Sequence, residues 1–500
     1  MNKLFKIEKL SFVFLIAVLL FFAIKIDAQE IKQLTLEEVI SLAEEQSPNA
    51  LIAKHSFRSS YWRYRTFVAQ YRPSLTLNGT TPDYSTAFDK VWNSQSNSYE
   101  YRAARTLSNL GSLSLSQNIG FTGGEVSLNS DLTIFNDIEN DTRRYITAPV
   151  TIGLNQPLFR YNELKWEKKT EPLRYEGAKK TFLANIENVH RMAVMNFFSL
   201  ALAQINREIA EMNFSNADTL YRIAQGRYTL GTIAEDELLQ MQLSWLNTET
   251  ARKDAAMRLR DREIRLRSFL GFNDQIRIEL ILPNEIPDLQ VTAQEVFDLA
   301  MENNPELVQQ ELTILLAQSS VAEAKSERGF NANLIASFGL RDQDSDFDLA
   351  YKYPYQQQQR IRVGFSMPIL DWGLGRGRYR MAQSGLELAQ VQSQQAIVDF
   401  QQNLYLDVEQ FNLQSEQVRI AAKSDTVAMK RYEVTKQRFL IGKIAVLDLN
   451  DADTRKDQNK RAYVQSLQNY WEYFFNIRAL TLFDFIGRKP IETDYEKLLE

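Results

Sequence analysis

The 500-residue sequence contains no cysteine and only two histidines. Without cysteine, the chain cannot form disulfides, thiolate metal sites or a cysteine nucleophile. His55 and His190 lie far apart in the sequence and lack the spacing of a paired metal site, so we interpret both as ordinary packed or surface residues. Nothing else in the sequence indicates a nucleophile, an acid–base pair or a cofactor motif, and we therefore expect a protein that is not an enzyme.

A strong charge excess and long apolar runs are also missing from most of the chain. The formal net charge is −5, which argues against a nucleic-acid partner, since such a partner favours a concentrated basic face. After residue 28, no window has the length and apolarity of a transmembrane helix, for which about 20 apolar residues are needed. If the mature chain lies in a membrane, it must do so as a β-barrel.

Residues 1–28 have the features of a secretory signal peptide. Lysines precede an apolar run over 10–24, and small residues suited to signal-peptidase cleavage end at Ala28. The run is too short to favour a membrane anchor, and no cysteine lies near the cleavage point to carry a lipid. We expect the mature chain to begin at Gln29.

The mature sequence repeats itself. Residues 221–243 align without a gap on residues 432–454, at an offset of 211, and residues 34–49 align on residues 291–306, at an offset of 257. The two offsets differ because the first copy carries 46 extra residues between the matched segments. Fold and function must therefore be interpreted for each repeat.

Each repeat begins with a helical segment of about 35 residues. Thr35 and Thr292 are each followed three residues later by a glutamate, which is the signature of a capping box. Pro48 and Pro305 fall at matching positions and predict a break between two helical pieces.

Alternating apolar and polar residues follow and predict two strands in each repeat. We expect polar loops between them, at 81–109 and 341–359. The returning strands end at Pro157 and Pro368, where pairing must stop. Apolar residues on one face only are typical of the lipid-facing wall of a membrane barrel, but the same period also fits an ordinary soluble hairpin.

The extra residues of the first copy predict one more hairpin. Apolar residues alternate on both sides of a Gly-Gly turn at 123–124, within residues 111–135. This pattern leaves open whether the hairpin joins the barrel or projects beyond the membrane.

Very long helices fill the rest of each repeat. No glycine or proline occurs over 178–225 or 386–441, which predicts helices of roughly 70 to 85 Å at 1.5 Å per residue. The chain then turns after Gly231 and Gly442 and returns over a comparable distance. The apolar stripe of these helices is too wide for one seam and needs neighbours on both sides, as in helices arranged around a cylinder. A flexible joint at 371–377, which lacks a phosphate-loop pattern, leads into the second long helix.

These elements define the expected domain organisation. After the signal peptide we expect a first repeat, a linker, a second repeat and a tail. Their bounds are 29–282 for the first repeat (strands about 73–158, helical hairpin 172–270), 283–290 for the linker, 291–487 for the second repeat (strands about 333–369, helical hairpin 377–486) and 488–500 for the tail.

The best repeated residues form the tips of the helical hairpins. Residues 227–231 and 438–442 both read Arg-aromatic-x-x-Gly, and the glycine suits the positive φ of a tight turn. Taken alone, this pattern also fits a simple helical hairpin. Together with the signal peptide, the two halves, the order of the elements and Gln-Pro-Leu-Phe at 156–159, it makes the sequence resemble the TolC family of outer-membrane efflux channels over about 35–486.

The resemblance implies a mainly α-helical fold with a membrane β-barrel. In this family a homotrimer shares one barrel in the outer-membrane lipid, with four strands from each subunit and twelve in all, and a long α-helical coiled-coil tunnel lies in the periplasm. The implied function is the passive exit duct of a tripartite efflux or type I secretion system in a Gram-negative bacterium. A periplasmic adaptor, or membrane fusion protein, would join the duct to an inner-membrane transporter.

The resemblance also implies acidic residues at the tunnel entrance, on the returning helix of the second hairpin. Asp448 and Asp451 match this pattern, and Glu237 and Gln240 are their first-repeat equivalents. Threefold symmetry would turn the aspartates into rings of carboxylates, which favour cations and can bind a blocking multivalent cation. The other interpretation is that both are helix-start acids that interact with the helix dipole.

The hairpin tips are implied to narrow the tunnel and to contact the adaptor. The residues concerned are Arg227, Tyr228, Gly231, Arg438, Phe439 and Gly442. A tyrosine at the second tip could hold the entrance shut through a hydrogen bond, but Phe439 has no hydroxyl, so a closed state would need other contacts.

A second interpretation of the whole chain is a periplasmic or surface coiled-coil protein with a structural or adhesive role and no pore. It predicts neither a detergent requirement nor ion conductance.

Overall fold

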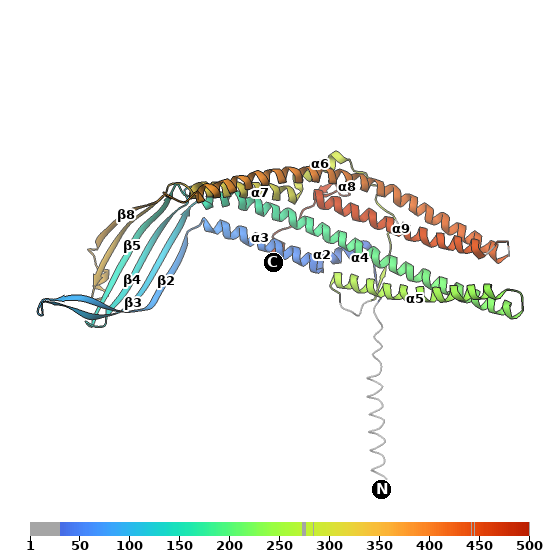
Figure 1. The fold of residues 1–500 in the computed structure, drawn as a ribbon, viewed down its shortest axis with the longest axis horizontal. Coiled ribbons are helices and arrows are strands. Elements are labelled where there is room, and N and C mark those ends of the chain that lie inside the picture. The colour runs from blue at the N-terminus through green and yellow to red at the C-terminus, as the bar shows by residue number, and fades with distance from the viewer. Residues whose placement is uncertain (1–30, 273–276, 284, 442, 445, 500) are drawn as a thin grey trace, which may run out of the picture. The chain divides into compact units, whose positions relative to one another are not determined.

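The computed structural model describes residues 31–272, 277–283, 285–441, 443–444 and 446–499 (Figure 1). The predicted signal peptide and Gly442 lie outside the described residues. Among the helices of these ranges, none is both long and apolar enough to cross a membrane. The chain divides into two compact units, and each draws on both repeats. We call them the tip unit (up to Lys54, Leu183–Glu302 and Leu404–Thr493) and the sheet unit (His55–Phe182, Asn303–Asn403 and Asp494–Glu500).

The helices occur in pairs of equal length. The pairs are α2 (Leu36–Gln46) with α6 (Ala293–Asn303), 11 residues each; α3 (Pro48–Gln70) with α7 (Pro305–Glu327), 23 residues each; α4 (Glu163–Thr229) with α8 (Leu374–Leu440), 67 residues each; and α5 (Glu235–Leu270) with α9 (Val446–Thr481), 36 residues each. The first two pairs start 257 residues apart and the last two 211 residues apart, which are the offsets seen in the sequence. The predicted internal repeat is therefore confirmed for each pair of helices, whereas the domain bounds stay a prediction.

Local side-chain chemistry explains where the short helices begin. The Thr35 hydroxyl accepts a hydrogen bond from Glu38 N at 3.3 Å, and the Glu38 carboxylate accepts one from Thr35 N at 2.8 Å, which completes the predicted capping box. In the second repeat, Thr292 accepts from Glu295 N at 3.3 Å. The break expected at each proline is also present, since α3 and α7 both start at the proline.

The long helices differ in length from the sequence-based expectation. Helices α4 and α8 start earlier than predicted and are about 100 Å long at 1.5 Å per residue, with Pro172 inside α4. The returning helices are only about half as long as α4 and α8, so the comparable length expected for them was wrong, although α5 ends at Leu270 as predicted. Gly271 (φ 70°) ends α5, and its N–H donates to the Arg267 carbonyl, while Leu482 (φ 51°) follows the end of α9. A left-handed residue at each of these points stops the helix.

The strands form one six-stranded antiparallel sheet in the order β2-β3-β4-β5-β7-β8 (Figure 1). The inserted hairpin lies within this sheet as parts of β3 and β4. The strands are β2 (Ser74–Asn93), β3 (Ser98–Ile119), β4 (Gly124–Asp137), β5 (Thr142–Leu158), β7 (Asn331–Asp344) and β8 (Gln356–Ser366).

Several predicted strand ends were wrong. The loop expected at 81–109 is mostly strand, because β2 ends only at Asn93 and β3 begins already at Ser98. Near this turn the rings of Trp92 and Tyr99 pack with centroids 4.9 Å apart. The loop expected at 341–359 is likewise shorter. Pairing does not stop at Pro157, which still lies opposite Asn333. A proline near a strand end costs little, because few ladder bonds remain to be lost there.

Short pairs of strands complete the chain. Strand β1 (Ile31–Leu34) pairs in parallel with β6 (Arg277–Leu280), and β9 (Phe483–Asp484) pairs with β10 (Lys489–Pro490). Two 3-10 turns, η1 (Leu349–Tyr351) and η2 (Lys497–Leu499), lie in the sheet unit.

The core of the tip unit confirms the broad apolar stripe expected for the long helices. Side chains on several faces of α4 are completely buried. Aromatic rings of α9 are buried as well, and one of them, Tyr470, packs against Phe411 of α8 with ring centroids 5.4 Å apart. Such burial on adjacent faces needs neighbours on both sides of the helix. The fully buried residues include Ala193, Val194, Phe197, Phe198, Leu200, Val464, Leu467 and Tyr470.

Candidate functional site

The six-stranded sheet has one apolar and one polar face. Residues directly opposite each other in an antiparallel ladder share a face, so one row can be followed across the strands. The row through Leu75, Leu115, Leu128, Ile152 and Phe338 is apolar in the first five strands. On β8 the same face continues with Ile361, Val363 and Phe365, opposite Ala336, Leu334 and Ala332.

The neighbouring row lies on the opposite face and is polar. It runs through Thr76, Ser114, Asn129 and Thr151. The Ser114 hydroxyl donates to the Asn129 side chain at 2.5 Å, so the row is linked by cross-strand hydrogen bonds. Arg360 and Arg362 of β8 extend this face, opposite Ser337 and Ile335. A sheet with these two faces can separate lipid from water.

The tips of both helical hairpins are closed by the same backbone hydrogen bonds. Thr232 N donates to the Arg227 carbonyl at 2.9 Å, and Lys443 N donates to the equivalent Arg438 carbonyl at 3.0 Å. Gly231 has the positive φ that the sequence predicted, 67°. Gly442 and the side chain of Phe439 lie outside what the structure describes, so their predicted roles are not tested by it. Tyr228 and Leu230 are exposed beside the first tip.

Asp448 and Asp451, the predicted entrance acids, have different surroundings. Asp448 is an exposed residue in the first turn of α9, without an ion pair to any residue in the described part of the chain. Asp451 accepts hydrogen bonds from Arg431 of α8 at 2.7 Å and from Arg455 of α9 at 2.9 Å. The bond from Arg431, together with Arg455, holds the pKa of Asp451 below its usual value. Asp451 therefore links the two helices of the second hairpin, and its charge is offset by two guanidinium groups.

These two arginines were not among the residues predicted from the sequence. The four-residue spacing from Asp451 to Arg455 is an ordinary helical ion-pair signal and could have been recognised. Arg431 lies 20 residues away on the other helix, and no local pattern indicates that contact.

The first hairpin uses different chemistry at the equivalent positions. Glu237 lies in the acidic first turn of α5, and Gln240 is exposed one turn later. Deeper in the hairpin, Tyr221 stacks on Trp245, with ring centroids 5.6 Å apart. In the second hairpin the corresponding pair is Tyr432 with Lys456, whose ammonium lies 4.1 Å from the ring centroid. The repeats thus keep the contact across the hairpin while exchanging an aromatic pair for a cation–π pair.

A buried ionic cluster joins several elements of the tip unit. Arg478 of α9 donates two hydrogen bonds to Glu187 of α4, at 2.8 and 2.9 Å, and a third to Asp484 at 3.0 Å. His190 lies 3.0 Å from Glu44 of α2 and 3.5 Å from Glu187, whose side chain is only 1% exposed. Burial opposes the charged imidazole, but the two carboxylates outweigh it and raise the pKa of His190 to about 9. The same contacts keep the pKa of Glu187 below its usual value despite burial.

This cluster accounts for one of the two histidines. His190 is a packed residue and His55 an exposed one, as the sequence interpretation held. Within the described ranges, no group of three or more histidine, aspartate or glutamate side chains is placed to hold a metal ion.

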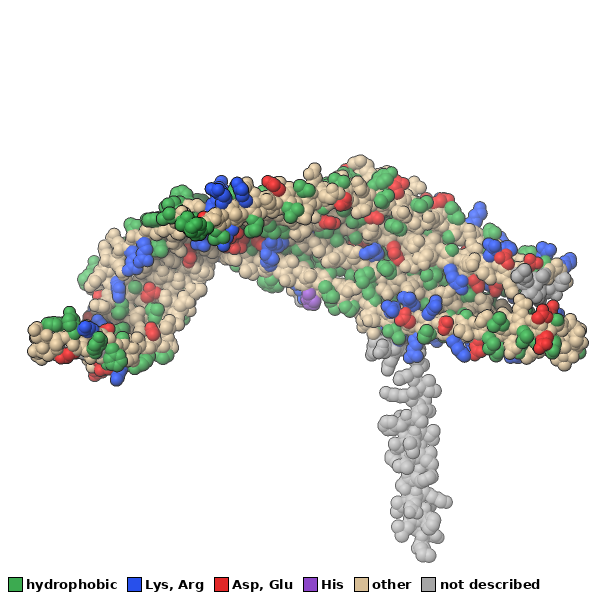
Figure 2. All heavy atoms as spheres, viewed as in Figure 1, with side chains coloured by type: hydrophobic (Ala, Val, Ile, Leu, Met, Phe, Trp, Pro, Cys, Tyr) green, Lys and Arg blue, Asp and Glu red, His purple; other side chains and the backbone are tan. Residues whose placement is uncertain are grey.

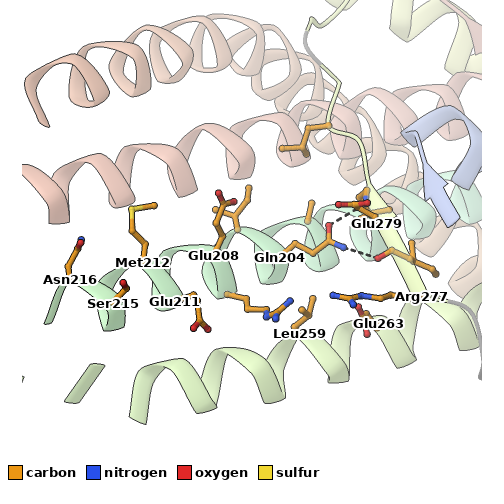
Figure 3. Close-up of a pocket in the computed structure, with 16 residues that line it drawn as sticks. Gln204, Glu208, Glu211, Met212, Ser215, Asn216, Leu259, Glu263, Arg277 and Glu279 are labelled. Carbon is orange, nitrogen blue, oxygen red and sulfur yellow. Dashed lines mark hydrogen bonds between the residues drawn. The ribbon is translucent and has the colours of Figure 1, made fainter. Parts of the chain in front are cut away.

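A groove in the tip unit lies between α4, α5 and β6 (Figure 3). Gln204 of α4 fixes β6 there, since its amide donates to the Ile278 carbonyl at 2.9 Å and accepts from Leu280 N at 3.3 Å. Charged residues of both signs line the groove, including Glu208, Glu263 and Arg277. This arrangement serves to attach the strand to the helix. Figure 2 likewise shows acidic and basic side chains interspersed along the helices on the face in view.

The joint at 371–377, expected from its glycines to be flexible, has hydrogen bonds to Asp371. The Asp371 carboxylate accepts hydrogen bonds from Gly373 N at 2.9 Å and Gly375 N at 2.8 Å. Hydrogen bonds from these backbone groups, first from Gly375, lower the pKa of the carboxyl group. Asp371 thus caps the start of α8.

Comparison with known proteins relates this architecture to a family. A family model described as Outer membrane efflux protein matches residues 39–272 and 296–481. A search of the curated proteins gives no match.

Solved structures of outer-membrane channels have a similar fold. The CmeC outer membrane channel of Campylobacter jejuni has a TM-score of 0.64 at 15% identity, covering 92% of this chain and 88% of that chain. The outer membrane protein VceC of Vibrio cholerae has a TM-score of 0.59 at 14% identity, covering 91% and 97%. The open state of the MtrE outer membrane channel of Neisseria gonorrhoeae has a TM-score of 0.51 at 13% identity, covering 92% and 91%. At these identities the likeness establishes a shared fold.

The family match spans most of both repeats, and the fold is that of TolC-family channels, so the resemblance inferred from the sequence is confirmed. The chain belongs to the outer membrane efflux protein family, a family of channel proteins.

Proposed function

We propose that the protein is a homotrimeric channel-tunnel in the outer membrane of a Gram-negative bacterium, where it acts as the passive exit duct of a tripartite efflux or type I secretion system. The observation that carries this proposal is the six-stranded sheet with one apolar and one polar face, attached to helices of about 100 Å. The apolar face suits contact with outer-membrane lipid, and the polar face suits a water-filled lumen.

The edges of the sheet support closure by further copies. Strands β2 and β8 each have a neighbour on one side only. Strand β2 runs away from the helix that precedes it and β8 runs toward the helix that follows it, so β8 of one copy can pair antiparallel with β2 of the next. Edges left unpaired in a membrane would expose backbone polar groups to lipid, at a cost of several kcal/mol for each group.

The hairpin tips are the proposed contact with a periplasmic adaptor, the membrane fusion protein that joins the duct to an inner-membrane transporter. Exposed Tyr228 and Leu230 offer apolar surface at the first tip, where Leu230 is 79% exposed. An exposed apolar side chain at the end of a long helical hairpin suits a docking surface. The transporter supplies the energy, and the duct conducts passively.

Conductance tests the proposed function directly. The mature protein, purified in detergent and reconstituted in a planar bilayer, should give discrete single-channel currents. If the protein stays soluble without detergent and gives no current, the coiled-coil interpretation without a pore replaces the channel.

We further propose that Asp448 forms the charged ring at the tunnel entrance and that Asp451 has mainly a structural role. In a trimer, three copies of Asp448 would concentrate negative potential around one opening, whereas the charge of Asp451 is offset by Arg431 and Arg455. Asp448→Ala should therefore weaken cation selectivity and block by trivalent cations nearly as much as Asp448→Ala combined with Asp451→Ala. Reversal potentials in a salt gradient measure this, with Glu237→Ala as the matched control in the first hairpin. Unchanged selectivity in the double variant would show that both are helix-start acids only.

A further inference from the structure

We propose that the inserted hairpin supplies two further wall strands, so that three copies close a wall of 18 strands where four strands from each copy would give twelve. The inference rests on the trimeric channel proposed above. It concerns the β3–β4 hairpin, and three independent features of the sheet unit support it: the anchoring of its turn, the pattern of its faces and the sheet edges that it leaves open.

The turn between β3 and β4 is anchored where the other strands meet the helices. Gln117 donates a hydrogen bond to the Tyr71 carbonyl at 2.8 Å, and Asn118 donates to the Gln70 carbonyl at 3.1 Å, so the end of β3 is tied to the end of α3. The Asn162 amide, just before α4, donates to the Gly120 and Phe121 carbonyls, both at 3.1 Å. A hairpin that projected from the sheet would not make these contacts.

Two glycines allow this close approach. A Cβ atom on Gly120 would lie 2.5 Å from Cε1 of Tyr71, and one on Gly124 would overlap Oε1 of Gln156. The turn is therefore packed closely against its neighbours, and a larger residue would fit only if the Tyr71 or Gln156 side chain moved away.

The hairpin also has the same two faces as the rest of the sheet. Leu115 and Leu128 continue the apolar row between Leu75 and Ile152. On the other face Ser112 is hydrogen bonded to Asp131, and Ser114 to Asn129. A hairpin outside the membrane would gain nothing from an apolar row in register with the wall.

The open edges of the sheet are β2 and β8, and both are far more exposed than the strands between them. All residues of β8 are exposed, including Ile361 at 79% and Phe365 at 75%. On β2, Leu77 is 78% exposed, whereas Leu115 of the inner strand β3 is 39% exposed. These edges need a partner, and a second copy is the partner whose strand direction and apolar face match.

The number of strands sets the width of the wall. With neighbouring strands about 4.8 Å apart and a tilt of about 40°, twelve strands give a diameter of about 24 Å between strand axes, and 18 strands give about 36 Å. The outer part of the duct would thus be about 1.5-fold wider, so cargo too bulky for a twelve-stranded wall could leave once it has passed the tunnel entrance.

Cysteine pairs test whether the hairpin lies in the wall, and the chain offers a cysteine-free background. Thr76 lies opposite Ser114, but it is separated from Thr151 by two intervening strands, a distance of about 14 Å. A disulfide needs Cα atoms about 4.4 to 6.8 Å apart. Oxidation of the full-length protein in membranes should therefore cross-link Thr76→Cys with Ser114→Cys and should not cross-link Thr76→Cys with Thr151→Cys.

The opposite pattern would overturn the inference. If the hairpin projects, β2 lies beside β5, so Thr76→Cys becomes able to cross-link with Thr151→Cys and loses its partner at Ser114→Cys. The pair Ser337→Cys with Arg360→Cys is the matched control, because these residues lie opposite each other on β7 and β8, which form a hairpin in either arrangement.

Deletion of residues 94–141 tests the width. It joins the end of β2 to the start of β5 and leaves four strands in each copy, so the largest neutral polymer admitted from the outer side should fall by about one third in radius. An unchanged cut-off would overturn the 18-stranded wall. If this variant does not fold, the cysteine pairs still decide. If the unmodified protein gives no current at all, the proposed channel function is refuted. The cysteine pairs then show only whether β3 lies beside β2 in the sheet.

Discussion

Replacing His190 by glutamine should remove the pH dependence of unfolding that this residue contributes above pH 6.5, roughly 2 to 3 kcal/mol. His190 is buried between Glu44 and Glu187, and its pKa is about 9 in the folded protein against about 6.5 in an unfolded chain. Since one pKa unit corresponds to about 1.4 kcal/mol, the charged imidazole contributes roughly 3 kcal/mol to the free energy of unfolding.

The sign of the effect follows from the raised pKa. The contribution is fully present below about pH 6.5, where both states bind the proton, and it is lost as the pH rises through about 9. The pKa values of Glu44 and Glu187 are lowered, so their contributions are present above about pH 4.5 and are lost as the pH falls. We therefore expect this cluster to stabilise the protein most between about pH 4.5 and 6.5.

The assay is thermal or chemical unfolding in mild detergent, followed by circular dichroism of the helices between pH 6 and 10. The unmodified protein should lose roughly 2 to 3 kcal/mol over this range from this site, and His190→Gln should not. His55→Gln is the matched control, because His55 is the only other histidine and is exposed. Equal pH dependence in His190→Gln and the unmodified protein would refute the reasoning.

Three further substitutions test other parts of the tip unit. Arg478→Ala leaves Glu187 buried without its bidentate partner and should cost about 3 to 5 kcal/mol in unfolding measurements; a cost below about 1 kcal/mol would contradict a buried ion pair. Gly231→Ala should destabilise the first hairpin by about 1 kcal/mol through its positive φ, seen as faster hydrogen exchange near the tip. The control is Gly226→Ala, nearby within helix α4, which should instead slow hydrogen exchange. The same change in exchange rate in both variants would exclude backbone strain at Gly231 as the cause. Tyr470→Phe removes the hydrogen bond to the Pro287 carbonyl and should lower the melting temperature at a cost of about 1 to 3 kcal/mol; no change would mean that the carbonyl finds water.

The fold was predictable wherever the signal is local or repeated. The capping residue Thr35, the prolines that start α3 and α7, and Gly231 at the first tip each act within one turn of the chain, and the offsets between repeats recover the paired helices. The ends of the strands were harder, because residues 81–109 are polar and continue as strand only through pairing with each other across the hairpin.

The candidate site was predictable in position but not in its interactions. The spacing from the tip placed Asp451 on the returning helix, but the partner that decides its charge, Arg431, comes from the other helix of the hairpin. The buried cluster was missed for the same reason, since Glu44, Glu187, His190 and Arg478 lie on three helices far apart in sequence. Such contacts depend on how helices pack, which composition and period do not encode.

The equal lengths of the paired helices constrain how this chain can change. Helices α4 and α8 are both 67 residues long, and α5 and α9 are both 36 residues long. An insertion of one heptad in α4 alone would lengthen that hairpin by about 10 Å on one side and move its tip out of level with the second tip. Length changes are therefore tolerable only in matched sets, in both arms of a hairpin and in both repeats at once. The lengths of the helices therefore fix the positions of both tips, and these positions must match the reach of the adaptor that we propose to contact them.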